Sequence, residues 1–339
     1  MHNTPKKINL IKLLDEITEV TTNWIRENVL RDDYGKLKPL IEHALTSTTP
    51  ASDRALMLRL GCELKGEDWL TALPGMASWE LLNINLLVTD DFFDKRTTVR
   101  MGRKTISQRY GDEACVALGF ILKSLASETL ISAWNKSARW SLRDAMEVLE
   151  WATKWLYYSQ FQEDELVKLP LSKCTLEMYI DLIKNATSIG IAGAFELGCI
   201  MGGSYKEERS RFRDFGIDLG YVFQIRDDLI DYIYNDSLIQ KGPFNDLFTK
   251  RRRLPLLVAY WEGTSLEKRQ IEGILRKNKL THKDALVITE MIVSQKVKKR
   301  ILSISGKIAD SAKKKLTGLP TCQPAKYILL DLIELAMDL

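Results

Sequence analysis

Histidine and paired cysteine are the clearest shortages in this 339-residue sequence. The five cysteines form no C-x-x-C pair, so neither a disulfide framework nor a thiolate metal site is indicated. Buried thiols in a reducing cytosol are the simpler interpretation. Only His2, His43 and His282 are present, and none has a neighbouring carboxylate or nucleophile pattern. Histidine acid–base chemistry is therefore not expected.

The sequence also lacks long apolar runs and a strong charge of one sign. No run approaches the roughly 18–20 apolar residues of a membrane span, and the stretch from Met1 to Leu10 has no apolar signal core. The net charge of +4 is small and spread along the chain, which gives no argument for nucleic acid. We expect a soluble cytoplasmic protein that has no transmembrane segment and binds no nucleic acid.

Strand signals are missing as well, because no alternating β-branched run is bounded by N-G or D-G turns. Helical periodicity dominates instead. The long helices that it predicts are Ile8–Asn28, Arg54–Leu64, Ser78–Asp94, Asp112–Trp134, Leu142–Phe161, Leu176–Met201 and Arg209–Tyr232. Breaks fall at proline and glycine clusters, such as residues 73–75, and none resembles an interdomain linker. We predict an all-α fold: one large helical bundle domain that spans residues 1–339.

Two acidic clusters of the form D-D-x-x-D stand far apart in these helices. Their acids are Asp90, Asp91 and Asp94 in the first cluster and Asp227, Asp228 and Asp231 in the second. Residues four apart share a helix face, and like charges at that spacing cost about 0.2–0.5 kcal/mol per pair. A cation would offset that cost. We predict two facing helices that hold Mg²⁺ between them, with an anionic substrate completing the coordination.

One such cluster alone is weak evidence, because charged helix faces produce the pattern often. The second cluster, however, is followed by the basic run 250–253 and then Leu254-Pro255. A solvated basic loop or a localisation tag is the simpler interpretation of this run, but its position after the acids favours a phosphate-facing lid. The acids at 163–165 are most simply solvated or capping residues.

The residues around both clusters resemble the trans-isoprenyl diphosphate synthase (polyprenyl synthetase) family. Residues 223–231 have the family's F-Q-x-x-D-D-x-x-D form, and Arg253-Leu254-Pro255 matches its T-L-P except at the first residue. Further matches are Glu80-Leu81-Leu82, Arg100, Gly102, Thr105 and Tyr110-Gly111 around the first cluster, Tyr179 with Lys184-Asn185-Ala186 for a Y…K-T-A element, and Gln160 with Asp164 for a Q…D element. Order and spacing agree from about residue 50 to 260.

The resemblance implies an isoprenoid synthase bundle with a central cavity, a prenyl diphosphate substrate, a homodimer, and three Mg²⁺ ions assembled with the substrate diphosphate. It implies Asp90, Asp94 and Asp227 as direct metal ligands, with Asp91, Asp228 and Asp231 as weaker or indirect partners. Arg100, Lys184 and Arg251, with Gln224, are the candidates for binding the diphosphate. The predicted catalytic residues are Asp90, Asp94, Asp227, Lys184 and Arg100.

The sequence departs from the family where isopentenyl diphosphate, the second substrate, binds. Residues 50–55 replace a G-G-K-R segment, Asn83 stands at a histidine position, and Val99-Arg100-Met101-Gly102 keeps one arginine of an R-R-G triplet. Each lost charge-assisted contact is worth about 1.5–3 kcal/mol. These losses favour a class I terpene synthase on a prenyltransferase scaffold, which ionises one C15 or C20 prenyl diphosphate and then cyclises it or eliminates a proton.

Such an enzyme needs an apolar cavity in which aromatic faces can stabilise a carbocation. The candidates for its wall are Asn83, Asn85, Leu86, Phe120, Phe161 and Phe223, although most aromatics on buried helices only fill the core. Two alternatives stay open. One is a chain-elongating prenyltransferase of the farnesyl or geranylgeranyl diphosphate synthase type, which uses isopentenyl diphosphate or another acceptor. The other is a non-catalytic partner subunit, against which the retention of six clustered acids argues.

Overall fold

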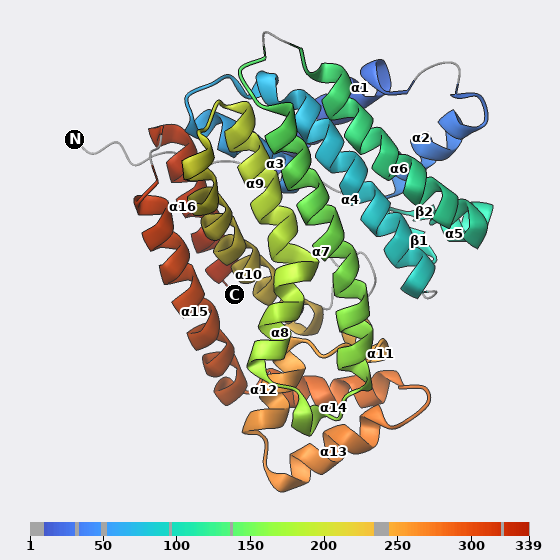
Figure 1. Cartoon of the computed structure of the whole chain (residues 1–339). Helices are drawn as coiled ribbons and strands as arrows, with labels where there is room; N and C mark the ends of the chain where they lie inside the picture. The colour runs from blue at the N-terminus through green and yellow to red at the C-terminus, as the bar shows by residue number, and fades with distance from the viewer. Residues whose placement is uncertain are drawn as a thin grey trace. The chain divides into compact units, whose positions relative to one another are not determined.

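The computed structural model describes residues 10–30, 34–48, 53–94, 97–135, 138–233, 244–319 and 322–338. The side chains of Thr48, Asp94, Ile233 and Gln323 lie outside this description, as do His2 and residues 50–52 of the segment that replaces G-G-K-R. Helices make up almost all of the described chain, as predicted (Figure 1).

The described residues divide into two compact units. Unit 1 comprises residues 1–150, 193–212 and 320–331, and unit 2 comprises residues 151–192, 213–319 and 332–339. The boundaries fall inside helices, except for the one after Leu319, which lies between the last two helices. The single domain stays a prediction, and each unit is described by itself.

Unit 1 is built around two long apolar helices that pack against each other, α4 (Leu73–Asp94) and α6 (Asp112–Ala133). The other α-helices wholly within it are α1 (Leu10–Asn28), α2 (Leu37–Thr48), α3 (Asp53–Leu64) and α5 (Ile106–Tyr110). The Ser78 hydroxyl donates to the Ala126 carbonyl of α6 at 2.7 Å, which ties the two helices together inside the core. Helix α4 begins at Leu73, earlier than predicted, because Pro74 is tolerated in a first turn.

Helix α6 is the one described helix that is long and apolar enough, by length and composition alone, to cross a membrane. The sequence analysis predicted no such segment. A core helix of a soluble protein satisfies the same criterion, and Leu118, Leu122 and Ala126 of α6 are fully buried in unit 1. The packing against α4 accounts for the buried face of α6, whereas Val116, Phe120 and Ile131 of the same helix are exposed on the single chain.

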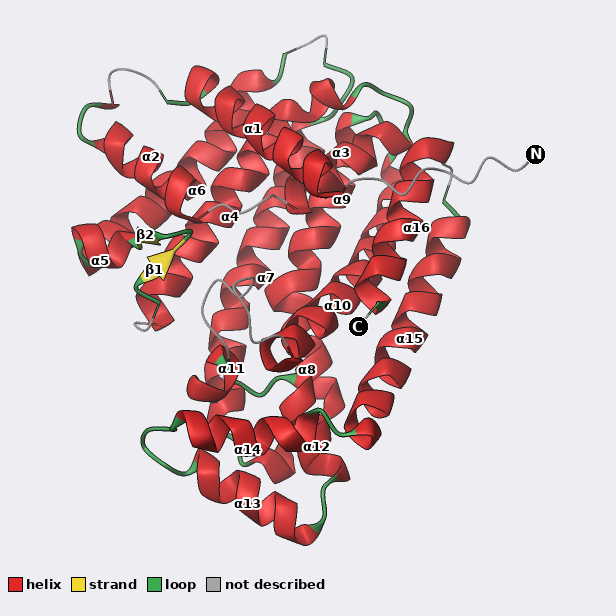
Figure 2. Cartoon of the chain, turned by 180° about the vertical axis from the view of Figure 1, so that it is seen from behind, coloured by secondary structure: helices red, strands yellow, loops and turns green. Residues whose placement is uncertain are grey.

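A two-stranded hairpin follows α4, although no strand was predicted. Strands β1 (Val99–Arg100) and β2 (Arg103–Lys104) pair antiparallel, with Arg100 opposite Arg103 (Figure 2). The two linking residues, Met101 and Gly102, have φ values of 48° and 70°. Positive φ at both positions matches the right-handed twist of a tight hairpin. Two-residue strands carry no alternating pattern, and M-G is not a usual turn signal, so the sequence did not reveal them.

Unit 2 contains most of α7 (Leu142–Lys168) and most of α10 (Arg209–Ile233), both close to their predicted starts. The predicted helix 176–201 consists of three consecutive segments: α8 (Leu176–Ile183), a π-helical turn at Lys184–Ser188, and α9 (Ile189–Met201). The helices wholly within unit 2 also include α11 (Asn245–Phe248), α12 (Leu254–Glu262), α13 (Ser265–Leu275), α14 (His282–Ile292) and α15 (Gln295–Thr317). Helix α9 and the last helix, α16 (Gln323–Met337), are each divided between the two units.

The core of unit 2 joins α8 and α10 to the C-terminal helices. Tyr179, Leu229, Leu257, Ile288 and Ile301 belong to one buried apolar cluster. Helix α12 lies at its centre and contacts α13, α14 and α15 (Figure 1). This packing fixes the segment before α12, which carries the basic run 250–253.

Candidate functional site

The first acidic cluster occupies the last turn of α4 in unit 1, on a helix as predicted. Asp90 is partly exposed, whereas Asp91 is only 1% exposed. The Arg100 guanidinium, itself buried, reaches both acids: its Nε lies 2.7 Å from Asp91 Oδ1 and its Nη2 lies 3.3 Å from Asp90 Oδ2. Arg100, predicted to bind the substrate diphosphate, therefore orients the two carboxylates in this structure.

The hairpin that carries Arg100 is fixed by His43 of α2. The His43 Nε2 atom lies 2.8 Å from the Lys104 carbonyl, and its Nδ1 lies 2.8 Å from Arg109 Nη1. Because an arginine can only donate, Nδ1 accepts, and Nε2 donates its proton to the carbonyl. His43 thus links α2, β2 and α5. The absence of histidine acid–base chemistry stays a prediction.

The cavity residues predicted in unit 1 come from α4 and α6. Asn83 and Asn85 are buried and Leu86 is partly buried, whereas Phe120 is 76% exposed on the single chain. A cavity of about 210 Å³ in this unit has a different lining, which includes Trp24, Leu125 and Thr129. The proposed apolar wall therefore stays a prediction.

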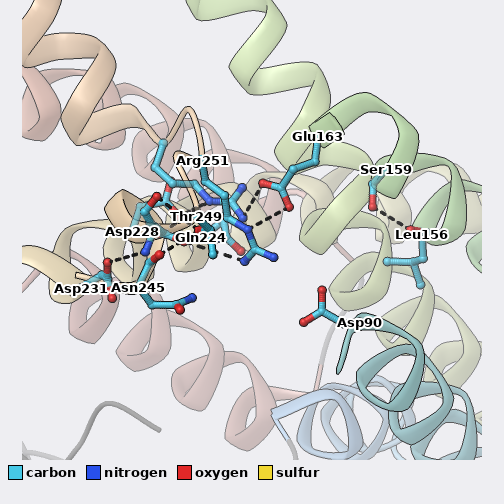
Figure 3. Close-up of polar contacts among 12 residues, drawn as sticks. Asp90, Leu156, Ser159, Glu163, Gln224, Asp228, Asp231, Asn245, Thr249 and Arg251 are labelled. Carbon is cyan, nitrogen blue, oxygen red and sulfur yellow. Dashed lines mark hydrogen bonds and ion pairs between the residues drawn. The ribbon is translucent and has the colours of Figure 1, made fainter. Parts of the chain in front are cut away.

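The second acidic cluster lies near the end of α10 in unit 2, and its three acids differ in exposure. Asp227 is exposed, Asp231 is partly buried, and Asp228 is only 2% exposed. The Tyr179 hydroxyl donates to Asp228 Oδ2 at 2.7 Å, and Gln224 Nε2 donates to Asp228 Oδ1 at 2.6 Å. Gln224 in turn accepts a hydrogen bond from the Thr187 hydroxyl. Both oxygens of Asp228 are thereby held in place. Figure 3 shows Gln224 beside Asp228.

Two glycines of α10 bring that helix close enough to α9 and the π turn for these contacts. A Cβ atom at Gly216 would lie 2.5 Å from the Ala192 Cα, and one at Gly220 would collide with the Ser188 Cα. Gly216, Gly220 and Gln224 follow one another at intervals of four residues, so they share one face of α10. The close approach of the two backbones lets Gln224 reach Thr187.

A network of arginines and acids surrounds the buried Asp228. Arg253 Nη2 lies 2.8 Å from Glu163 Oε1, and its Nε lies 3.7 Å from Asp246 Oδ2 and 3.9 Å from Asp228 Oδ1. Arg251 Nε lies 3.3 Å from Glu163 Oε2, and its Nη1 lies 3.8 Å from Asp246 Oδ1 (Figure 3). The interpretation of Glu163 as a solvated or capping acid is wrong, because it bridges both arginines.

The basic run 250–253 is therefore not a solvated loop within the described structure. Arg252 donates to the carbonyls of Lys250, Val167 and Leu169 at 2.9–3.2 Å. The Lys250 ammonium donates to the Lys277 carbonyl at 2.6 Å. The run is held by its own side chains against the end of α7 and the loop after α13. The expectation of a diphosphate-facing lid stays a prediction.

Burial and crowding of negative charge change the acidity of the second cluster. Burial raises the pKa of Asp228 from 3.8 to about 7; the Arg253 guanidinium opposes the rise and the Asp246 carboxylate adds to it. Burial and then the Asp246 carboxylate raise the pKa of Asp231 from 3.8 to about 7. The pKa of Tyr179 is raised well above its ordinary value by burial and by Asp228, so its hydroxyl keeps its proton and donates. An added cation would favour the ionised carboxylates.

The residues present fit a divalent cation that a substrate helps to bind. No three His, Cys, Asp or Glu side chains converge into a ready-made metal site among the residues that the structure describes. Mg²⁺ commonly binds one or two carboxylates and takes its other oxygens from water and phosphate groups. Hard carboxylate oxygens beside Asp228 and Asp231, where negative charge is in excess, suit that mode of binding.

Other predicted residues are spread over unit 2. Lys184 is exposed at the start of the π turn, and Phe223 is partly buried on α10. Phe161 is 71% exposed on α7. Asn185, which follows Lys184, is buried and donates to Gln162 Oε1 at 2.7 Å. The two acidic clusters belong to different units, so their meeting at a common ion cluster stays a prediction.

Comparisons with known proteins identify the family. The sequence profile of the family described as Polyprenyl synthetase matches residues 45–292. A geranylgeranyl diphosphate synthase from Methanosarcina mazei is 24% identical over 281 residues, which cover 83% of each protein. The chain belongs to the polyprenyl synthetase family, as the motifs indicated.

Solved structures confirm the all-α isoprenoid synthase fold. A decaprenyl diphosphate synthase from Rhodobacter capsulatus superposes with a TM-score of 0.81 at 21% identity, over 97% of this chain and 98% of that one. A polyprenyl synthase from Caulobacter crescentus, in complex with calcium and isoprenyl diphosphate, gives a TM-score of 0.81 at 22% identity, over 97% of both chains.

Proposed function

We propose that the protein is a Mg²⁺-dependent prenyltransferase that extends an allylic prenyl diphosphate with isopentenyl diphosphate, as geranylgeranyl and farnesyl diphosphate synthases do. The observation that carries the proposal is the paired construction of the two D-D-x-x-D clusters. Each holds its second aspartate buried and hydrogen-bonded while its first aspartate is more exposed. The family membership and the name of the Methanosarcina relative support the same reaction class.

Bound Mg²⁺ would neutralise the diphosphate as its bond to carbon breaks. Asp90, Asp94 and Asp227 are the proposed direct ligands, and three ions assembled with the diphosphate are the proposed complement. Lys184 is exposed, and it is the proposed point charge for the diphosphate. Arg100 acts through Asp90 and Asp91, and Gln224 acts through Asp228, so both are positioning residues in this proposal.

The terpene synthase interpretation becomes the second candidate, because the relatives support chain elongation better. One observation still favours it. Arg100 is the single arginine left of the R-R-G triplet, and it is buried against Asp90 and Asp91. Asn83, at the histidine position, is buried and carries no charge. Both features weaken the site for a second diphosphate.

Product analysis decides between the two candidates. The purified protein is incubated with Mg²⁺ and geranyl, farnesyl or geranylgeranyl diphosphate, with and without isopentenyl diphosphate. Longer prenyl diphosphates that form only with isopentenyl diphosphate would establish chain elongation. A hydrocarbon or terpene alcohol formed without it would establish the terpene synthase. Release of diphosphate in neither reaction would favour the third possibility, a non-catalytic partner subunit.

We further propose a soluble enzyme that works as a homodimer in the cytoplasm. Helix α6 serves in this proposal as a core helix rather than a membrane span. Light scattering coupled to size-exclusion chromatography measures the oligomeric state, and a monomer at micromolar concentration would contradict the dimer.

A further inference from the structure

Arg253 occupies an unusual place for an arginine, inside a group of acids beside the second cluster. Its side chain is 9% exposed, and its guanidinium faces Glu163, Asp246 and Asp228 at 2.8, 3.7 and 3.9 Å. These acids come from α7, from α11 and from α10. One cation thus joins three segments that are distant in sequence. It stands at the position where the family motif T-L-P has a threonine.

The charges around Arg253 nearly balance without any metal ion. Glu163, Asp246 and Asp228 carry up to three negative charges, and Arg251 and Arg253 supply two positive ones. Removal of one partner from a buried ion pair leaves an uncompensated charge, which is strongly destabilising. A threonine at 253 would leave the acids with Arg251 alone.

Arg253 has too little exposed surface to bind a substrate phosphate directly. Its neighbour Arg252 is about as buried, with residue exposures of 8% for Arg252 and 7% for Arg253. Arg252 donates to three backbone carbonyls and lies beside Cys174, whereas Arg253 contacts carboxylates. Substitution of Arg252 should therefore test a general structural contribution, whereas substitution of Arg253 also tests the contact with acids. This difference gives a matched control inside the chain.

We propose that Arg253 is a resident counter-ion that takes the place of a metal ion beside Asp228, Asp246 and Glu163. It is a positioning residue: it holds the inner acids in their arrangement without metal and leaves Asp227 and Asp231 as the carboxylates of this cluster that face Mg²⁺. The inference rests on the proposed use of Mg²⁺ by the second cluster. It implies that the cluster is preformed before the metal and the diphosphate arrive.

The test compares Arg253→Thr, Arg253→Lys and the control Arg252→Thr with the unaltered protein. Thermal unfolding is followed in EDTA and during titration with Mg²⁺ alone, and calorimetry measures Mg²⁺ binding with inorganic pyrophosphate present. We expect both threonine variants to unfold at lower temperature in EDTA. Only Arg253→Thr should regain stability with Mg²⁺ and bind it roughly tenfold or more tightly, since a repelling unit charge near the ion is gone. Arg253→Lys should resemble the unaltered protein.

Equal Mg²⁺ responses of Arg253→Thr and Arg252→Thr would overturn the proposal. If Arg253→Thr does not fold, the double variant Arg253→Thr/Asp246→Asn decides, because it removes one cation and one acid together. Recovery of a folded protein with a Mg²⁺ response like that of the unaltered chain supports the counter-ion. Failure to recover contradicts it. Unfolding and calorimetry need no turnover, so these results stand apart from the test of the proposed reaction.

Discussion

The first and second acidic clusters each hold one buried aspartate in place, but with different partners. In both, the second aspartate is buried and the first is more exposed, with Asp91 at 1% and Asp228 at 2% exposure. Asp91 is bound directly by a charged group, the Arg100 guanidinium at 2.7 Å. Asp228 accepts its hydrogen bonds from two neutral donors, Tyr179 and Gln224, and its cation Arg253 is farther away, at 3.9 Å. The comparison teaches that a D-D-x-x-D motif contains one anchoring acid and more exposed acids for binding. Charge balance at the anchor sets how each cluster responds to mutation, pH and metal.

The largest effect is expected from the more exposed acids. Asp90→Ala and Asp227→Ala should each lower kcat/KM for the prenyl substrate by about 100-fold or more, because each removes a proposed metal ligand that stabilises the transition state. Circular dichroism and thermal unfolding should stay near those of the unaltered protein. Asp310→Ala, an exposed acid of α15, is the matched control with normal turnover. Near-normal turnover of Asp90→Ala or Asp227→Ala would contradict the proposal that the substituted aspartate is a metal ligand.

The anchoring acids should differ in their contribution to stability. Asp91→Asn leaves the buried Arg100 without its closest carboxylate and should lower the free energy of unfolding by about 3 kcal/mol. Asp228→Asn keeps one acceptor oxygen for a neutral donor and should cost about 1–2 kcal/mol. Urea unfolding of both variants measures the difference. A larger loss for Asp228→Asn would reverse the contrast drawn between the clusters.

The second cluster should also make stability depend on pH. The pKa values of Asp228 and Asp231 are raised from 3.8 to about 7, so the folded protein keeps protons that the unfolded chain loses above pH 4. Their contribution to stability is therefore full below about pH 4 and is lost as the pH rises through 7. Thermal midpoints in EDTA from pH 5 to 8 should fall less steeply for Asp231→Asn than for the unaltered protein. Added Mg²⁺ should flatten the unaltered profile, and identical slopes with and without metal would contradict this account.

The effect farthest from the acids concerns the helix contact that supports Gln224. Gly220→Ala places a methyl group against the Ser188 backbone and should lower the free energy of unfolding by about 1–3 kcal/mol. Gly273→Ala of α13 is the control, since no atom lies within 4 Å of its added Cβ. That substitution should be neutral or stabilising by up to about 1 kcal/mol. Equal behaviour of the two variants would show that the close approach is not needed.

The sequence predicted those parts of the molecule whose causes are local. Apolar periodicity predicted the all-α fold and most starts of the long helices, and the spacing of acids placed both clusters on helices. The Met101-Gly102 hairpin was not predicted, because its strands are only two residues long. The π turn at 184–188 was not predicted, because it continues the helical run without a proline or glycine to mark a break.

The partners of the site residues could not be predicted, because they come from distant segments. Glu163 and Arg253 are 90 positions apart, and only the tertiary fold makes them neighbours. The R-L-P departure from T-L-P was visible in the sequence, but its meaning depends on the acids that surround Arg253. The preference for a terpene synthase weighed missing cations alone, and the relatives now favour chain elongation.

The π turn has a geometric consequence for the anchoring of Asp228. Thr187 follows Tyr179 by eight positions, and in a regular α-helix it would point about 80° away from the direction of Tyr179. The wider turn at Lys184–Ser188 takes up an additional residue and corrects this angular phase. Tyr179 can then donate a hydrogen bond to Asp228, while Thr187 donates to Gln224, one turn earlier on α10. Loss of a single residue between 184 and 188 would restore the regular helix and turn one of the two hydroxyls out of register.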